Sequence, residues 1–111
     1  MTARDGAGDE PLAVPSIDKL IHEPARLAIM ANLYVVESAD FMFLMRRTDL
    51  TFGNLSSHLS KLEAAGYIKI EKGFKGRKPH TMIHLTKAGR AAFEDYRKSM
   101  RRMFEDLPGS P

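Results

Sequence analysis

The sequence contains four histidines, the side chains most suited to catalysis or metal binding: His22, His58, His80 and His84. His80 and His84 alternate onto one side of a predicted strand, which could supply half of a metal site. The chain has no cysteine and no acid lies on that strand, so solvated or dimer-facing histidines are the simpler interpretation. No serine, histidine and acid are ordered around a recognisable cleft. We therefore predict that the protein is not an enzyme and binds no metal and no cofactor.

The stretch NLSSHLSKL, from Asn54 to Leu62, predicts a helix with an unusual polar face. At 100° per residue, leucines 55, 59 and 62 form one apolar stripe. The far side carries Gly53, Asn54, Ser57 and Lys61, with His58 on the flank. Asn, Ser and Gly each cost roughly 0.5 to 1 kcal/mol against Ala in an exposed helix, so stability alone would not select them. Small hydrogen-bonding side chains allow a helix to approach base edges closely in the DNA major groove. The alternative is that this polar face has no partner and is simply tolerated by the fold.

A cluster of cations follows this helix. The period of the apolar residues changes to two in YIKIEK and in TMIHLT, which predicts two strands. Between them KGFKGRKP supplies the glycines and proline of a hairpin turn. The segment 72–79 contains no acid and four cations: Lys72, Lys75, Arg77 and Lys78. The net charge is +3, and residues 1–24 hold two basic and five acidic side chains, so the rest of the chain carries +6 and favours an anionic partner.

Three helices are expected to position these features. Residues 1–15 have no periodicity and predict a flexible leader, whereas order should begin near Ser16. Pro24 suits the first turn of a helix that is apolar nearly all round over 27–36 and should therefore lie inside the domain. Ser38 or Asp40 can cap a short second helix. Thr51 can cap the third, residues 52–65, and can meet a phosphate together with the helix N-terminus. Gly66 can end it in the left-handed conformation.

A long last helix, about 87–107, begins after Thr86 and carries an apolar seam with spacings of three and four. A small domain has few internal surfaces that could cover so long a helix, so we expect the seam to pack against a second copy of the chain. Packing of the seam against the first helix of the same chain is the alternative. The predicted dimer interface contains Ile17, Leu20, Ile21, Phe93, Tyr96, Met100, Met103 and Leu107. A small-molecule effector could lie between the first and last helices near several methionines, but methionine also fills core gaps without a ligand. These are Met30, Met42, Met45, Met100 and Met103.

Three stretches, LIHEPARLAIM, LTFGNLSSHLSKLEAAGYI and HLTKAGRAAF, together resemble the small winged-helix transcriptional regulators of the MarR/ArsR kind, over roughly residues 16–106. The resemblance implies a homodimeric bacterial or archaeal regulator that reads DNA with the helix 52–65 and uses EKGFKGRKPHT as its wing. By position in the motif, the reader residues would be Thr51, Asn54, Ser57, His58 and Lys61, and Arg77 would be the wing residue nearest DNA. The chain departs from this pattern in two places. The cysteine ligands of many ArsR-type sensors are absent, which argues against metal sensing, and Phe52 stands where a polar or basic residue is common.

The expected fold is mainly α (α+β): a winged helix-turn-helix over residues 16–107, with a two-stranded β-hairpin wing and a long C-terminal dimerisation helix. The expected function is a homodimeric repressor that binds double-stranded DNA sequence-specifically, through the helix 52–65 in the major groove and the wing 72–79 on the backbone or minor groove. No apolar run approaches the ~20 residues that cross a bilayer, so a cytoplasmic, nucleoid-associated protein is expected. The alternative is a winged helix that serves as a protein interaction module.

Overall fold

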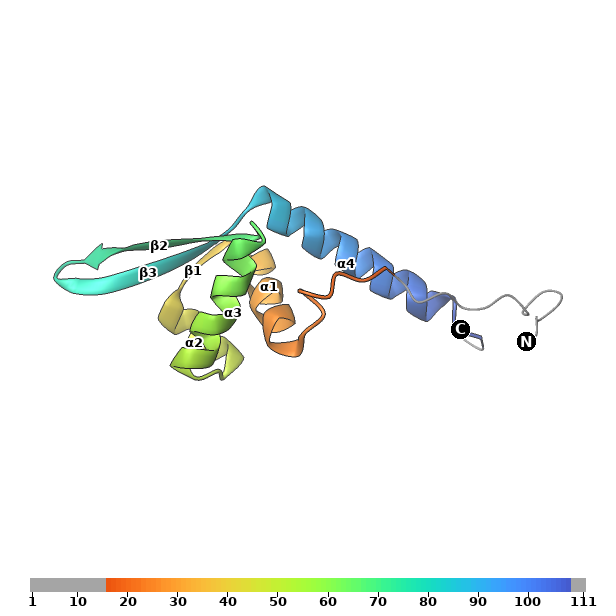
Figure 1. Cartoon of the computed structure of the whole chain (residues 1–111), viewed down its shortest axis with the longest axis horizontal. Coiled ribbons are helices and arrows are strands. Elements are labelled where there is room, and N and C mark those ends of the chain that lie inside the picture. The colour runs from red at the N-terminus through yellow and green to blue at the C-terminus, as the bar shows by residue number, and fades with distance from the viewer. Residues whose placement is uncertain (1–15, 109–111) are drawn as a thin grey trace.

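The computed structural model describes residues 16–108, which form a winged helix (Figure 1). Its elements in chain order are α1 (Pro24–Val36), β1 (Ser38–Asp40), α2 (Phe41–Thr48), α3 (Phe52–Ala64), β2 (Ile68–Lys75), β3 (Lys78–Leu85) and α4 (Lys87–Glu105). The predicted order of helices and hairpin is confirmed. The predicted leader, residues 1–15, lies outside the described residues.

Each helix begins where a side chain can accept a backbone N–H that the helix itself leaves unpaired. The predicted caps are confirmed: Asp40 accepts from the amide of Phe43 at 2.7 Å, and Thr51 and Thr86 cap α3 and α4 in the same way. Glu23, which the sequence did not single out, caps α1 ahead of Pro24 at the first helical position. The start of each helix is therefore encoded by one or two residues.

The end of α3 is equally local in origin. Gly66 adopts φ = +81°, which confirms the predicted left-handed end of the helix, and the amide of Tyr67 donates to the carbonyl of Leu62 at 3.0 Å, as in a Schellman motif. The Tyr67 hydroxyl then donates to Asp18, which raises the pKa of Tyr67 to about 12. Asp18 also accepts from the amides of Leu20 and Ile21, so it fastens the segment before α1 to the end of α3.

The sheet has three strands in the order β1–β3–β2, all antiparallel, where the sequence predicted two. β1 was missed because three residues are too short to show an alternation. The register pairs Ile70 with Ile83 and Lys69 with His84, so the predicted separation of apolar and polar faces is confirmed. The hairpin is the wing, and it extends well past the helices (Figure 1).

The core lies where α1, α2, α3 and the inner face of the sheet meet, with part of α4 closing one side. Its fully buried side chains are Ile21, Ile29, Met30, Leu33, Leu44, Leu55, Leu59, Leu62 and Ile83. The prediction that α1 is buried nearly all round is wrong at its C-terminal end. Val35 is 79% exposed and Val36 is 42% exposed, so the apolar side chains of the last turn are not all covered.

Candidate DNA-binding surface

The reader helix α3 divides into a buried apolar face and an exposed polar face. Leucines 55, 59 and 62 are buried in the core. The predicted reader residues Thr51, Asn54, Ser57 and Lys61 are all exposed. The Thr51 side-chain oxygen accepts the amide of Asn54 at 3.2 Å, so this threonine fixes the start of the helix as well as standing at its exposed tip. The polar face is thus a continuous surface that no described element covers.

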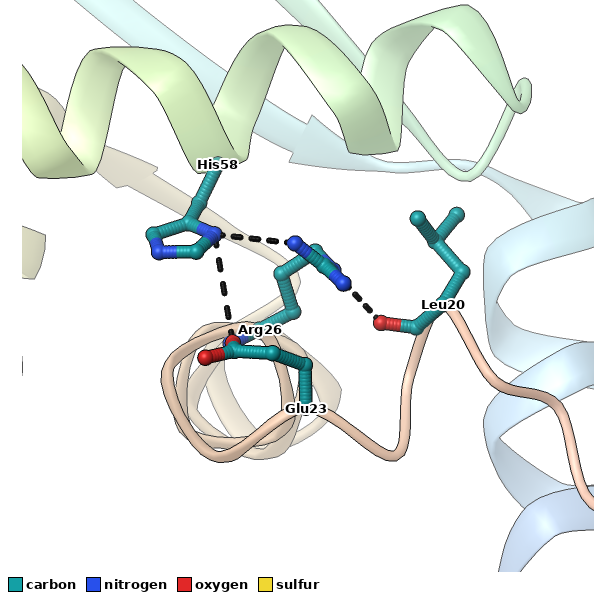
Figure 2. Close-up of polar contacts among 4 residues, drawn as sticks. All are labelled: Leu20, Glu23, Arg26 and His58. Carbon is teal, nitrogen blue, oxygen red and sulfur yellow. Dashed lines mark hydrogen bonds and ion pairs between the residues drawn. The ribbon is translucent and has the colours of Figure 1, made fainter.

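His58 is placed differently from the other predicted reader residues. Its side chain is only 19% exposed and turns toward α1, where Nδ1 lies 3.1 Å from Nη1 of Arg26 and 3.9 Å from Oε1 of Glu23 (Figure 2). A guanidinium can only donate, so the 3.1 Å bond makes Nδ1 an acceptor and places the ring proton on Nε2. His58, predicted as a reader residue, forms a structural hydrogen bond between α3 and α1 in this structure.

The residues around His58 tie the start of α1 to the reader helix. Nε of Arg26 donates to the carbonyl of Leu20 at 2.6 Å, which holds the guanidinium in place beneath α3 (Figure 2). The backbone amide of Arg26, which donates to the Glu23 carboxyl, is the main cause of the lowered pKa of Glu23, and the positive charge of Arg26 contributes. Glu23 therefore stays ionised at the N-terminus of α1, where a negative charge is favourable. This cluster fixes the position of α3 relative to α1.

The wing carries the predicted cations on an open hairpin. Lys72, Lys75, Arg77 and Lys78 are all exposed. Gly76 takes φ = +65° in the turn, a conformation that glycine adopts without strain, and Arg77 follows it at the tip. The segment 72–79 of this hairpin contains no acid, so its four cations offer several donors to phosphate groups.

The outer face of the sheet pairs each of its two histidines with an acid from a neighbouring strand. Nε2 of His80 lies 3.6 Å from Asp40 of β1, and Nε2 of His84 lies 3.3 Å from Glu71 of β2. The amide of Phe43 is the main cause of a lowered pKa at Asp40, and His80 contributes. Within residues 16–108 no three histidine, cysteine or acidic side chains gather into a metal site. His80 and His84, whose spacing suggested half of a metal site, thus make two separate contacts with acidic side chains.

Comparison with known proteins decides the family. The profile of the winged helix DNA-binding domain matches residues 25–104. The chain belongs to that family. An uncharacterized protein of Methanocaldococcus jannaschii is 37% identical over 78 residues, which cover 70% of this chain and 85% of that protein.

Two solved structures place this winged-helix protein among transcriptional regulators. A transcriptional regulator homologue from Pyrococcus horikoshii has a TM-score of 0.74 at 32% identity and covers 79% of this chain and 89% of its own. A MarR-family regulator from Silicibacter pomeroyi has a TM-score of 0.59 at 26% identity and covers 81% of this chain and 62% of its own. The resemblance predicted from the sequence is confirmed: the protein is a DNA-binding winged-helix transcriptional regulator.

A groove of about 540 Å³ lies beside the reader helix of this winged-helix regulator, between α2, α3 and the wing. Phe52 lines it, is 66% exposed and stacks on Phe41 with ring centroids 4.8 Å apart, so it covers the apolar edge of the motif. Met42 also lines the groove, whereas Met30 is in the core. Met42 therefore does not belong to the space between the first and last helices in which an effector was considered.

The predicted dimer residues separate into core and surface. Ile21 is completely buried in its own chain, which corrects its assignment to an interface. Phe93 and Tyr96 are 6% and 7% exposed, and Phe93 packs on Tyr34 with centroids 5.0 Å apart, so the first half of the seam is intramolecular as the open alternative allowed. Ile17, Leu20, Met100 and Met103 are half-buried, and Leu107 is exposed. The second half of α4 runs beyond the body of the domain (Figure 1).

No helix within residues 16–108 is long and apolar enough to cross a membrane.

Proposed function

We propose that this regulator is a homodimeric repressor that binds double-stranded DNA sequence-specifically. The observation that carries the proposal is the exposed polar face of α3 beside the wing segment 72–79, which holds four cations and no acid. In this arrangement Asn54 can pair with adenine, Ser57 with several base edges, and Lys61 with guanine or phosphate. Thr51 and the start of α3 can meet a phosphate. The wing cations would lie along the backbone and the minor groove.

Dimerisation would rest on the part of the seam that the single chain leaves open. Met103 is half-buried near the end of α4, and Leu107, two residues beyond that helix, is 44% exposed. Leu20 and Ile17, half-buried before α1, complete the proposed surface. A two-fold axis through it would present two reader helices to successive major grooves, about 34 Å apart. The pair would cover a short pseudo-palindrome and block promoter access at the nucleoid.

A gel-shift titration at several salt concentrations tests the proposal. Each phosphate contact releases counterions, so the logarithm of the binding constant should fall linearly with the logarithm of salt concentration. Binding that does not weaken as salt rises, or no binding to duplex DNA, would leave the protein interaction module as the better account. Light scattering of the free protein tests the dimer separately.

A further inference from the structure

The tip of the wing carries an exposed aromatic ring. Phe74 is 75% exposed, on a strand segment whose neighbours are all exposed. A single exposed phenylalanine is common on protein surfaces. The surroundings of Phe74 are less common, because the segment 72–79 holds four cations and no acid. A partner for this surface must be anionic and also offer a flat apolar face. A nucleic acid, with bases between phosphates, offers both.

The sheet register decides which way this ring projects. Phe74 pairs with Pro79, and Ile70 pairs with the buried Ile83. Side chains two residues apart share a face, so Phe74 lies on the inner face with Ile70, the face that packs against the helices. α3 packs against β2. Phe74 therefore projects on the side of the sheet where the reader helix lies, and a duplex docked on α3 passes in front of it.

The length of the hairpin matches a step between grooves. Ile70 is the last half-buried residue of β2, and residues 71–75 continue the strand fully exposed. Five strand residues at ~3.3 Å each reach about 17 Å, which is half of the ~34 Å helical repeat of DNA. Half a repeat separates a major groove from the adjacent minor groove. Lys72, on the inner face between Ile70 and Phe74, lines the groove against α3 and keeps this gap cationic.

We infer that Phe74 is an apolar wedge that enters the minor groove next to the one read by α3 and partly unstacks a base step there. The inference rests on the proposed function and adds a second source of specificity to it. Flexible pyrimidine–purine steps open at the lowest cost, so the wedge selects deformable DNA at a position that α3 does not touch. The ring replaces part of the lost base stacking, and the cations of the wing hold the phosphates of the bent duplex.

The test uses duplexes that the wild-type protein selects from a random 25-base-pair pool. Each selected duplex is labelled with 2-aminopurine at successive positions, and a second set carries fluorophores at both ends to measure bending. Binding of the wild-type chain should raise the 2-aminopurine fluorescence at one step about 5 base pairs from the centre of the half-site, half of a 10–10.5 base-pair repeat. The ends of the duplex should move closer together.

Phe74→Ala should abolish the fluorescence rise and the bend, and should weaken binding roughly 5- to 150-fold, the loss expected for one base–aromatic contact. Phe74→Leu should keep part of the bend. Val35→Ala, which removes an exposed apolar side chain from α1 and not from the wing, should change neither signal.

Two results would overturn the wedge while leaving the proposed function intact. One is a Phe74→Ala chain that binds and bends DNA like the wild type. The other is a wild-type complex without any 2-aminopurine signal, which would place the ring against the backbone and not between bases. Failure of the wild-type chain to bind any duplex would instead remove the proposed function, and the wedge with it.

Discussion

Gly89 should be the most sensitive glycine of the domain. It lies in the first turn of α4, and a Cβ atom added there would stand 2.1 Å from the carbonyl oxygen of Tyr67, against 3.4 to 4 Å for ordinary contact. That oxygen is held in place because it accepts the amide of Thr86 at 3.1 Å. Leu85 Cδ1 would lie 3.0 Å away on another side. Gly89→Ala must therefore displace the start of α4 by more than 1 Å.

The change in unfolding free energy caused by Gly89→Ala is the sum of two opposing effects. Overpacking costs about 1 to 3 kcal/mol, and a contact with backbone places Gly89→Ala at the upper end of that range. Alanine has a higher helix propensity than glycine and stabilises the helix by about 1 kcal/mol, so the net destabilisation is roughly 2 kcal/mol. For a domain of this size the melting temperature should fall by about 8 to 16 °C.

Gly53→Ala is the matched control, because both glycines are helical and the same atom is added. Nothing lies within 4 Å of the added Cβ at Gly53, so that variant should gain about 0.5 to 1 kcal/mol of stability. Thermal and urea unfolding followed by circular dichroism measure both changes. A Gly89→Ala chain that melts within about 2 °C of the wild type would refute the close packing of α4 on Tyr67.

Three further substitutions test the surface and its supports. Arg77→Ala should weaken binding to all duplexes alike and reduce the salt slope by about 1, as measured by gel shift, and a loss confined to one sequence would contradict the assignment of Arg77 to phosphate. His58→Ala should lower the free energy of unfolding in urea by about 1 to 2 kcal/mol. A double-mutant cycle with Arg26→Ala should show coupling between the two residues. Strictly additive effects would mean that the 3.1 Å hydrogen bond between Arg26 and His58 does not hold α3 to α1. The pKa of Asp40 is lowered on folding, so its charge adds stability that is present above the ordinary aspartate pKa and is lost as pH falls through the lowered value. The loss of unfolding free energy caused by Asp40→Asn should therefore shrink in acid. A loss that stays constant across the pH titration would count against this account.

The sequence predicted best the features that depend on residues near one another in the chain. Caps at Asp40, Thr51 and Thr86 and the glycine end of α3 each need only a few adjacent side chains, so the helix boundaries were close to those observed. The reader helix, predicted as 52–65, spans Phe52–Ala64. β1 escaped because its pairing partner lies more than 40 residues away and its three residues show no pattern of their own.

The errors at the site come from contacts that helical periodicity does not encode. Periodicity put His58 on the flank of α3, but only the packing of α1 shows that Arg26 lies against it. In the same way Ile21 and Phe93 were recognised as apolar, and the fold alone shows that they face their own core and not a second chain. The sequence could identify the polar face and the basic wing because each is a local cluster. It could not place Phe74 on the same side as α3 without the register of the hairpin.

The central claim is that the exposed polar face of α3 reads base edges, and the most direct measurement compares wild type and Asn54→Ala on two duplexes. One duplex is selected by the wild-type protein from a random pool, and the other has the same composition in scrambled order. Asn54→Ala should lose about 1 to 3 kcal/mol of binding on the selected duplex and almost nothing on the scrambled one, because Asn54 would pair with a base and not with phosphate. An equal loss on both duplexes, or no loss on either, would contradict the account.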